Sequence, residues 1–161
     1  MSWRARRREP EARHLVASFP RSAPVETATD VLVVDTSAAL AALAARPSDE
    51  ELIARLSGDG DLHAPHLIDV ELVHSLRRLV RTGAISHDRA EEIRTDYADL
   101  AITRYAHHPL VDRMWALRHN LTAYDAAFVA LSEALGVPLV TCDARVATAP
   151  GHKAVVELFG R

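Results

Sequence analysis

Four acidic residues stand at positions where carboxylates from distant parts of the chain can act together. Asp35 ends the apolar run at residues 31–34, and Asp143 ends a second apolar run. Glu71 lies in an amphipathic helical pattern, and Asp125 lies near the start of an apolar helical pattern that leads into the second apolar run. Clustered carboxylates repel one another, and a divalent cation relieves that repulsion. Because hard oxygen ligands suit Mg²⁺ or Mn²⁺, such a cluster has the chemistry to activate water against a phosphodiester.

Each acid taken alone also has an ordinary structural explanation. Asp125 fits a helix N-terminus of the capping-box type together with Thr122, Glu71 fits a solvated helix position, and Asp143 fits the start of a turn. Asp35 is harder to explain in this way, because a carboxylate at the end of a buried strand is costly without a partner. The metal hypothesis therefore depends on the joint placement of the four acids.

The elements that must position these acids alternate along the chain. Short apolar runs predict strands at residues 31–34, 61–65, 101–105, 137–141 and 155–158. Helical patterns occupy residues 38–45, 48–56, 66–81, 86–100, 109–119 and 122–135. This alternation predicts an α/β fold, a three-layer α/β/α sandwich with a central parallel sheet. Because parallel strands end at one edge, that edge would gather all four acids.

Composition and charge narrow the class of protein. The chain has 161 residues, 48% of them hydrophobic and 25% charged, which is typical of one globular domain. No apolar stretch is long enough for a membrane span, and no apolar segment follows the arginines at residues 6–8. Cys142 is the single cysteine, so an internal disulfide is impossible. We expect a soluble, cytoplasmic protein.

Four segments resemble, in order and spacing, the motifs of the PIN-domain family, and in particular its VapC-type toxins. They read VVDTS at residues 33–37, VELVHSLRR at 70–78, LTAYDAAFVALSE at 121–133 and LVTCD at 139–143. The resemblance covers about residues 31 to 158. It implies a PIN-like fold and a metal-dependent endoribonuclease that cleaves RNA. It also implies a cognate antitoxin protein that inhibits the enzyme, and a homodimer.

The resemblance also implies roles for individual residues. It assigns catalysis and the ligation of Mg²⁺, with Mn²⁺ as an alternative, to the acids Asp35, Glu71, Asp125 and Asp143. It assigns supporting hydroxyls to Thr36, Ser37 and Thr141, which neighbour the first and last acids.

Candidates to hold RNA phosphates are Arg77, Arg78 and Arg118, with Arg81 and Arg104 as further ones. An ordinary surface charge remains the alternative for each arginine.

Two helical residues near these candidates receive structural interpretations. Asp69 competes with Glu71 as an acid of the same helix, but it lies toward Val73 and Leu76, so we interpret it as helping to start that helix. Trp115 is interpreted as a core residue, not as a platform on which bases stack.

The domain division follows the charge. Residues 1–29 contain many arginines and no sustained periodicity, and we expect a basic, disordered N-terminal extension. A start site assigned too far upstream, or a basic arm that touches nucleic acid, would give the same composition. Residues 30–161 form the expected PIN-like nuclease domain. Its excess of acids is unusual for a nucleic-acid binder unless metal ions neutralise part of the charge.

Rival functions fit the residues less well. A phosphatase of the haloacid dehalogenase type needs a second aspartate two residues after Asp35, where this chain has Ser37, and Lys153 is its sole lysine. The histidines form no convincing zinc set. The alternative that stays open is a catalytically silent PIN-like module that binds RNA or a protein.

Overall fold

A computed structural model describes residues 31–44, 50–58 and 60–160. The extension expected at residues 1–29, whether a disordered segment or a basic arm, lies outside the described residues. The predicted start of a helix at Ser48 also lies outside them.

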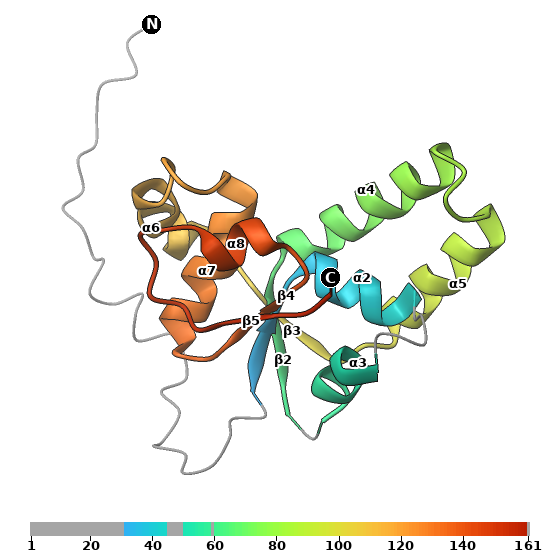
Figure 1. Ribbon diagram of the computed structural model, residues 1–161, viewed down its shortest axis with the longest axis horizontal. Helices are drawn as coiled ribbons and strands as arrows, with labels where there is room; N and C mark the ends of the chain where they lie inside the picture. Colours follow the sequence, from blue (N-terminus) through green and yellow to red (C-terminus); the bar gives the residue numbers. More distant parts are fainter. Residues whose placement is uncertain (1–30, 45–49, 59, 161) are drawn as a thin grey trace, which may run out of the picture.

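A five-stranded parallel sheet forms the centre of the molecule (Figure 1). Its strands are β1 (Leu32–Val34), β2 (Leu62–Pro65), β3 (Ile102–Tyr105), β4 (Leu139–Thr141) and β5 (Val156–Leu158). They lie in the order β3-β2-β1-β4-β5, and each neighbouring pair is parallel. The predicted α/β fold with a central parallel sheet is therefore confirmed, and all five expected strands are present.

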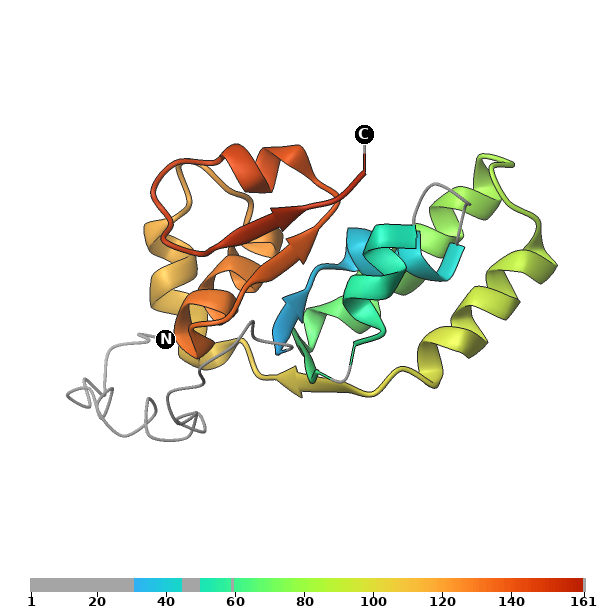
Figure 2. The ribbon, with the colours of Figure 1, turned by 60° about the horizontal axis from the view of Figure 1, so that its bottom comes forward.

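Helices cover both faces of this sheet. They are α2 (Thr36–Ala44), α3 (Glu50–Leu56), α4 (Leu67–Arg81), α5 (His87–Ala98), α6 (Val111–Ala116), α7 (Ala123–Leu135) and α8 (Ala144–Thr148), with a short 3₁₀ turn η3 (His108–Leu110). Figures 1 and 2 show α2, α3, α4 and α5 on one side of the sheet, and α6 and α7 on the other. No helix within the described ranges is long and apolar enough to cross a membrane.

The core lies around β1 and α7. Leu32, Val33 and Val34 of β1 are at most 1% exposed, as expected for a strand buried on both faces. Residues 126–132 of α7 are all buried, so this helix is enclosed on every side. Gly136 then ends α7 in the left-handed conformation that glycine adopts without strain. The core therefore holds β1, which precedes Asp35, and the middle of α7, which follows Asp125.

Two segments differ from the sequence-based expectations. The helix expected at residues 109–119 is shorter, because η3 occupies its start at Pro109 and α6 ends at Ala116. Helix α8 was not expected at all. It has five residues, too few for an apolar period, and it begins because the Asp143 side chain accepts a hydrogen bond from the Arg145 backbone N–H.

Candidate active site

Asp35 lies directly after β1, where two hydroxyls from different elements meet its carboxylate. Ser37 Oγ donates to Asp35 Oδ2 at 2.5 Å, and Thr141 Oγ1 donates to the same oxygen at 2.7 Å. Ser37 Oγ in turn accepts a hydrogen bond from the Cys142 backbone N–H at 2.9 Å. Burial raises the pKa of Asp35, although these hydrogen bonds act in the opposite direction. The β1 and β4 ends thus fix one carboxylate between them.

Glu71 reaches the same place from α4. Thr36 Oγ1, in the first turn of α2, donates to Glu71 Oε2 at 2.6 Å. Burial raises the pKa of Glu71, and the negative charges of Asp35 and Asp125 add to the shift. The three carboxylates therefore lie close enough to influence one another.

Asp125 lies in the first turn of α7, and its neighbour Thr122 is the N-cap of that helix. Thr122 Oγ1 accepts a hydrogen bond from the Asp125 backbone N–H at 3.2 Å and donates to Asp125 Oδ2 at 2.7 Å. The capping arrangement considered from the sequence is therefore present. It also fixes the carboxylate on the side of the sheet where the other acids lie.

Asp143 differs from the other acids because it has an arginine of its own. Arg145 Nη2 lies 2.5 Å from Asp143 Oδ2, and Arg145 Nε lies 3.1 Å from Oδ1. The Arg145 backbone N–H also donates to Oδ1 at 2.8 Å. The hydrogen bonds from Arg145 lower the pKa of Asp143. This acid is already compensated by a positive charge within the chain.

All four predicted acids line one cavity of about 1330 Å³. Thr36 and Ser37 lie in its wall as well. Thr141 is not a lining residue, but its hydroxyl donates a hydrogen bond to Asp35, which is one. Apolar side chains from α2, α4, α7 and the C-terminal segment complete the wall, among them Leu40, Val70, Tyr124 and Leu158. The structure thus brings together every acid and every hydroxyl that the sequence singled out, whereas their catalytic and metal-binding roles stay predictions.

The donor chemistry of the cavity fits a hard divalent cation. Asp35, Glu71 and Asp125 offer carboxylate oxygens, and none of them forms an ion pair with a residue that the structure describes. Among the described residues, however, no three acidic, histidine or cysteine side chains are already gathered as a ligand group. The carboxylates line the same cavity without forming a ligand group, so binding of a cation would have to bring them closer together.

The candidate phosphate-binding arginines are placed differently from one another. Arg78 lines the cavity and lies on the same stripe of α4 as Glu71, two turns further along, whereas Arg77 and Arg118 are not among its lining residues. The Arg118 guanidinium lies 4.7 Å from the centre of the Trp115 ring. The interpretation of Trp115 as a core residue is wrong, since its side chain is 67% exposed on the outer face of α6.

Asp69 and Arg104 bind each other instead of contributing to the cavity. Arg104 Nε lies 2.9 Å from both carboxylate oxygens of Asp69, and the Tyr97 hydroxyl donates to Asp69 at 2.6 Å. Asp69 does lie in the first turn of α4, as expected, but it also ties that helix to β3 and α5. Arg104 is therefore engaged in the fold and is not a free phosphate-binding group.

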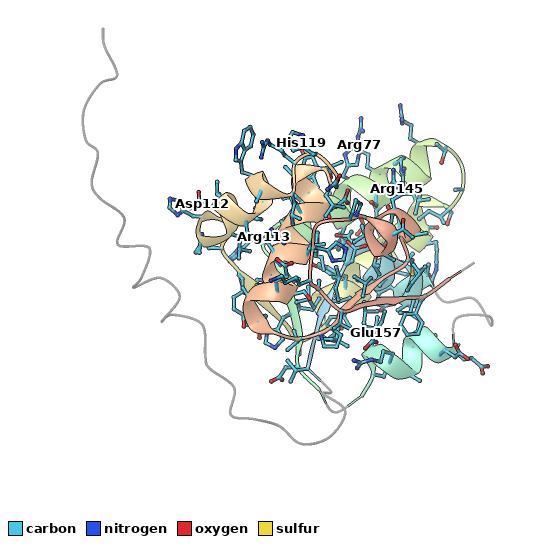
Figure 3. All side chains as sticks on the ribbon, turned by 60° about the vertical axis from the view of Figure 1, so that its left-hand side comes forward. Arg77, Asp112, Arg113, His119, Arg145 and Glu157 are labelled. Carbon is cyan, nitrogen blue, oxygen red and sulfur yellow. The ribbon has the colours of Figure 1, made fainter. Side chains whose placement is uncertain are left out.

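Sequence reasoning missed Arg145 as a residue of this site. Arg145 lines the cavity, and Figure 3 shows it toward the same end of the molecule as Arg77, with Glu157 toward the other end. The sequence does place Arg145 two residues after the candidate ligand Asp143, and this spacing was the signal that could have indicated a contact. That spacing indicates a contact only if a helix starts between the two residues, and α8 was not expected.

Comparison with known proteins gives consistent matches. The PIN domain family model matches residues 32–151. Ribonuclease VapC1 of Mycobacterium tuberculosis is 42% identical over 130 residues, which cover 80% of this chain and 98% of that protein. Ribonuclease VapC9 of the same organism is 46% identical over 119 residues, covering 72% and 88%. Ribonuclease VapC12 is 37% identical over 128 residues, covering 80% and 98%.

Two solved structures share the fold. VapC20 of Mycobacterium tuberculosis, described as a sarcin-ricin loop cleaving toxin, matches with a TM-score of 0.54 and 18% identity over 77% of this chain and 98% of that one. VapBC2 from Rickettsia felis, bound to a DNA fragment from its promoter, matches with a TM-score of 0.58 and 11% identity over 80% and 98%.

Proposed function

Because this chain belongs to the PIN-domain family, within its VapC-type group, we propose that it is an endoribonuclease acting as the toxin of a toxin-antitoxin pair. The observation that carries this proposal is the single cavity lined by Asp35, Glu71, Asp125 and Asp143 at the carboxyl edge of the sheet. Relatives that match over nearly their whole length are named ribonucleases, which supports the same activity.

The proposed cofactor is Mg²⁺, with Mn²⁺ as an alternative, held by oxygens of Asp35, Glu71 and Asp125, with Asp143 at the margin of the set. A bound divalent cation supplies an activated water and stabilises the leaving oxygen of a phosphodiester. The carboxylates of this chain are suited to that task because each is oriented in advance. Hydroxyls of Ser37, Thr141, Thr36 and Thr122 hold them. Less conformational freedom is then lost when a ligand binds.

RNA phosphates would be held by arginines around the cavity. Arg78 is the best placed of the sequence candidates, because it lines the cavity together with Glu71. Arg77 and Arg118 would act farther along the RNA, outside the cavity wall. An acidic cavity repels a polyanion, so cations at its margin are needed to bring the substrate in.

A protein partner is supported by the surface of α4. Val70 and Val73 expose their side chains on this helix, and Val70 also lines the cavity. One of the structural neighbours is named as a VapBC pair, which supports a cognate antitoxin for this chain. We further propose that the protein forms a homodimer in the cytoplasm.

Expression in a bacterial host tests the toxin function. The intact chain should arrest growth and leave cellular RNA cut at defined positions, whereas Asp35→Asn should not. Asp112→Asn makes the same chemical change on an exposed residue of α6 and should arrest growth like the intact chain (Figure 3). Co-expression of the small protein encoded beside it should relieve the arrest. Equal toxicity of the intact chain and Asp35→Asn would contradict the proposal.

A further inference from the structure

Arg145 lines the cavity and pairs with Asp143, while most of its side chain is exposed to water. Its side chain is 87% exposed, whereas that of Asp143 is 23% exposed. The Nε and Nη2 groups contact Asp143, and Nη1 forms no hydrogen bond with any residue that the structure describes. An ion pair this exposed contributes little to folding stability. Arg145 can therefore exchange or extend its contacts at small cost.

The charges of the cavity wall give this arginine a particular place. The wall carries the four candidate acids and Glu51, and its arginines are Arg78 from α4 and Arg145 from α8. The hydrogen bonds and charge of Asp143 raise the pKa of Arg145, and the negative charge of Asp125 adds to the shift. Asp125, Asp143 and Arg145 all line the cavity. Arg145 therefore supplies a positive charge to a wall that carries five carboxylates.

We propose that Arg145 grips a phosphate of the RNA at the mouth of the cavity, and that Asp143 holds its guanidinium in place for this contact. The proposal rests on the proposed ribonuclease function and adds a residue to it. A guanidinium presents donors in a planar fork that matches two phosphate oxygens. The carboxylate of Asp143 contacts Nε and Nη2, which leaves Nη1 and the second N–H of Nη2 to form the other fork of the guanidinium.

This assignment separates the four acids into two groups. Asp35, Glu71 and Asp125 are held by hydroxyls, and none of them forms an ion pair with a described residue. Asp143 has its positive charge already, from Arg145. Asp143 would then act on the substrate through Arg145, as a positioning residue, more than through direct ligation of a cation.

Binding of RNA without metal tests the proposal. A labelled single-stranded RNA of mixed sequence is titrated in EDTA, at several salt concentrations, with the intact protein, Arg145→Gln and Arg145→Lys. Arg145→Gln should weaken binding on the order of tenfold. It should also reduce the slope of log affinity against log salt by about 0.7, the value for one phosphate contact with a single strand. Arg145→Lys keeps the charge and should keep the slope.

Two controls separate this role from a structural one. Arg94→Gln removes an exposed, ion-paired arginine of α5 outside the cavity wall and should leave affinity and slope unchanged. Calorimetric titration with Mn²⁺ alone should show undiminished affinity in Arg145→Gln. The proposal is overturned if Arg145→Gln binds RNA like Arg94→Gln, if Arg145→Lys loses the same slope, or if Mn²⁺ affinity falls in step with RNA affinity. Since RNA binding in EDTA needs no cleavage, failure of the nuclease function would be seen separately.

Discussion

The carboxylates of the candidate site are each held by a neighbour, and the neighbours are of two chemical kinds. Hydroxyls hold Asp35, Glu71 and Asp125, whereas a guanidinium holds Asp143. A hydroxyl orients a carboxylate without removing its charge, so these three acids keep their attraction for a cation. A guanidinium satisfies the charge directly. The partner of each acid therefore indicates which acids remain available to a metal.

Thr122 offers a test of this orienting role. Thr122→Ala removes the N-cap of α7 and the hydroxyl donor to Asp125 in one step. We expect a loss of about 1 kcal/mol in the free energy of unfolding, as for other N-cap threonines. We also expect a several-fold drop in RNA cleavage, because Asp125 loses its fixed orientation. Urea unfolding and initial cleavage rates measure the two effects.

Ser86→Ala is the matched control for Thr122→Ala. Ser86 caps α5 by accepting a hydrogen bond from the Arg89 backbone N–H at 3.1 Å, and it is not among the residues that line the cavity. It should lose similar stability but keep full cleavage, and Thr122→Ser should keep both. Equal cleavage by the Thr122→Ala and Ser86→Ala variants would show that Thr122 acts as a cap alone.

The residues of the site were predictable to different degrees. Asp35 was identified because a carboxylate after a buried strand is unusual, and the strand is indeed at most 1% exposed. The contacts of Arg145 were not predictable, because they depend on a helix of five residues. Trp115 was misplaced because an apolar side chain on a short helix is assigned to the core by default, and here it faces outward.

At the scale of elements, an ion pair between Arg113 and Glu133 joins α6 and α7 to the segment before β5. Arg113 of α6, labelled in Figure 3, donates to Glu133 of α7 through Nε at 2.6 Å and Nη2 at 2.8 Å. Arg113 Nη2 also donates to the Gly151 carbonyl at 2.9 Å, and the Lys153 backbone N–H donates to Glu133 at 2.6 Å. One ion pair thus connects three segments of the chain.

This ion pair should give the stability a defined pH dependence. The hydrogen bonds from Arg113 lower the pKa of Glu133 below its ordinary value of 4.5. Its contribution is therefore fully present above about pH 5 and is lost as the pH falls through the lowered pKa. Glu133→Gln should lose about 1–2 kcal/mol of unfolding free energy at pH 7, since water partly screens Arg113. The difference from the intact protein should shrink toward pH 3.

Glu92→Gln is the control for this prediction. Glu92 pairs with Arg89 at 2.8 Å on the surface of α5 and is far more exposed than Glu133. Its substitution should change the unfolding free energy little at any pH. A gap between Glu133→Gln and the intact protein that stays constant from pH 7 to pH 4 would rule out the titration of Glu133 as its cause.

The elements themselves were largely predictable. All five strands were expected within two residues at either end. Aliphatic runs predicted β1 and β4 most directly, because such runs are typical of strands buried in a parallel sheet. Helices α4, α5 and α7 were expected for a different reason, from their longer helical patterns. Helix α6 was expected to be longer and α8 was not expected, since a 3₁₀ turn at Pro109 and the cap at Asp143 are decided by local hydrogen bonds.

At the scale of the whole molecule, the site exists because the sheet is parallel. The four acids come from the ends of β1 and β4 and from α4 and α7, and they are spread over more than a hundred residues of sequence. Parallel topology brings these points to one edge, and α7 covers the sheet beside them (Figure 2). The joint position of the acids was predictable from strand direction, whereas the shape of the cavity required the structure.

Cleavage of RNA by the purified protein tests the central claim most directly, that this cavity is a metal-dependent nuclease site. Cleavage should require Mg²⁺ or Mn²⁺, stop in EDTA and return when metal is restored. Asp35→Asn should lose on the order of a hundredfold or more in rate, and Asp112→Asn should match the intact protein. RNA binding without cleavage under every metal condition would indicate the catalytically silent module instead. Cleavage by Asp35→Asn in EDTA at the rate of the intact protein would contradict the claim.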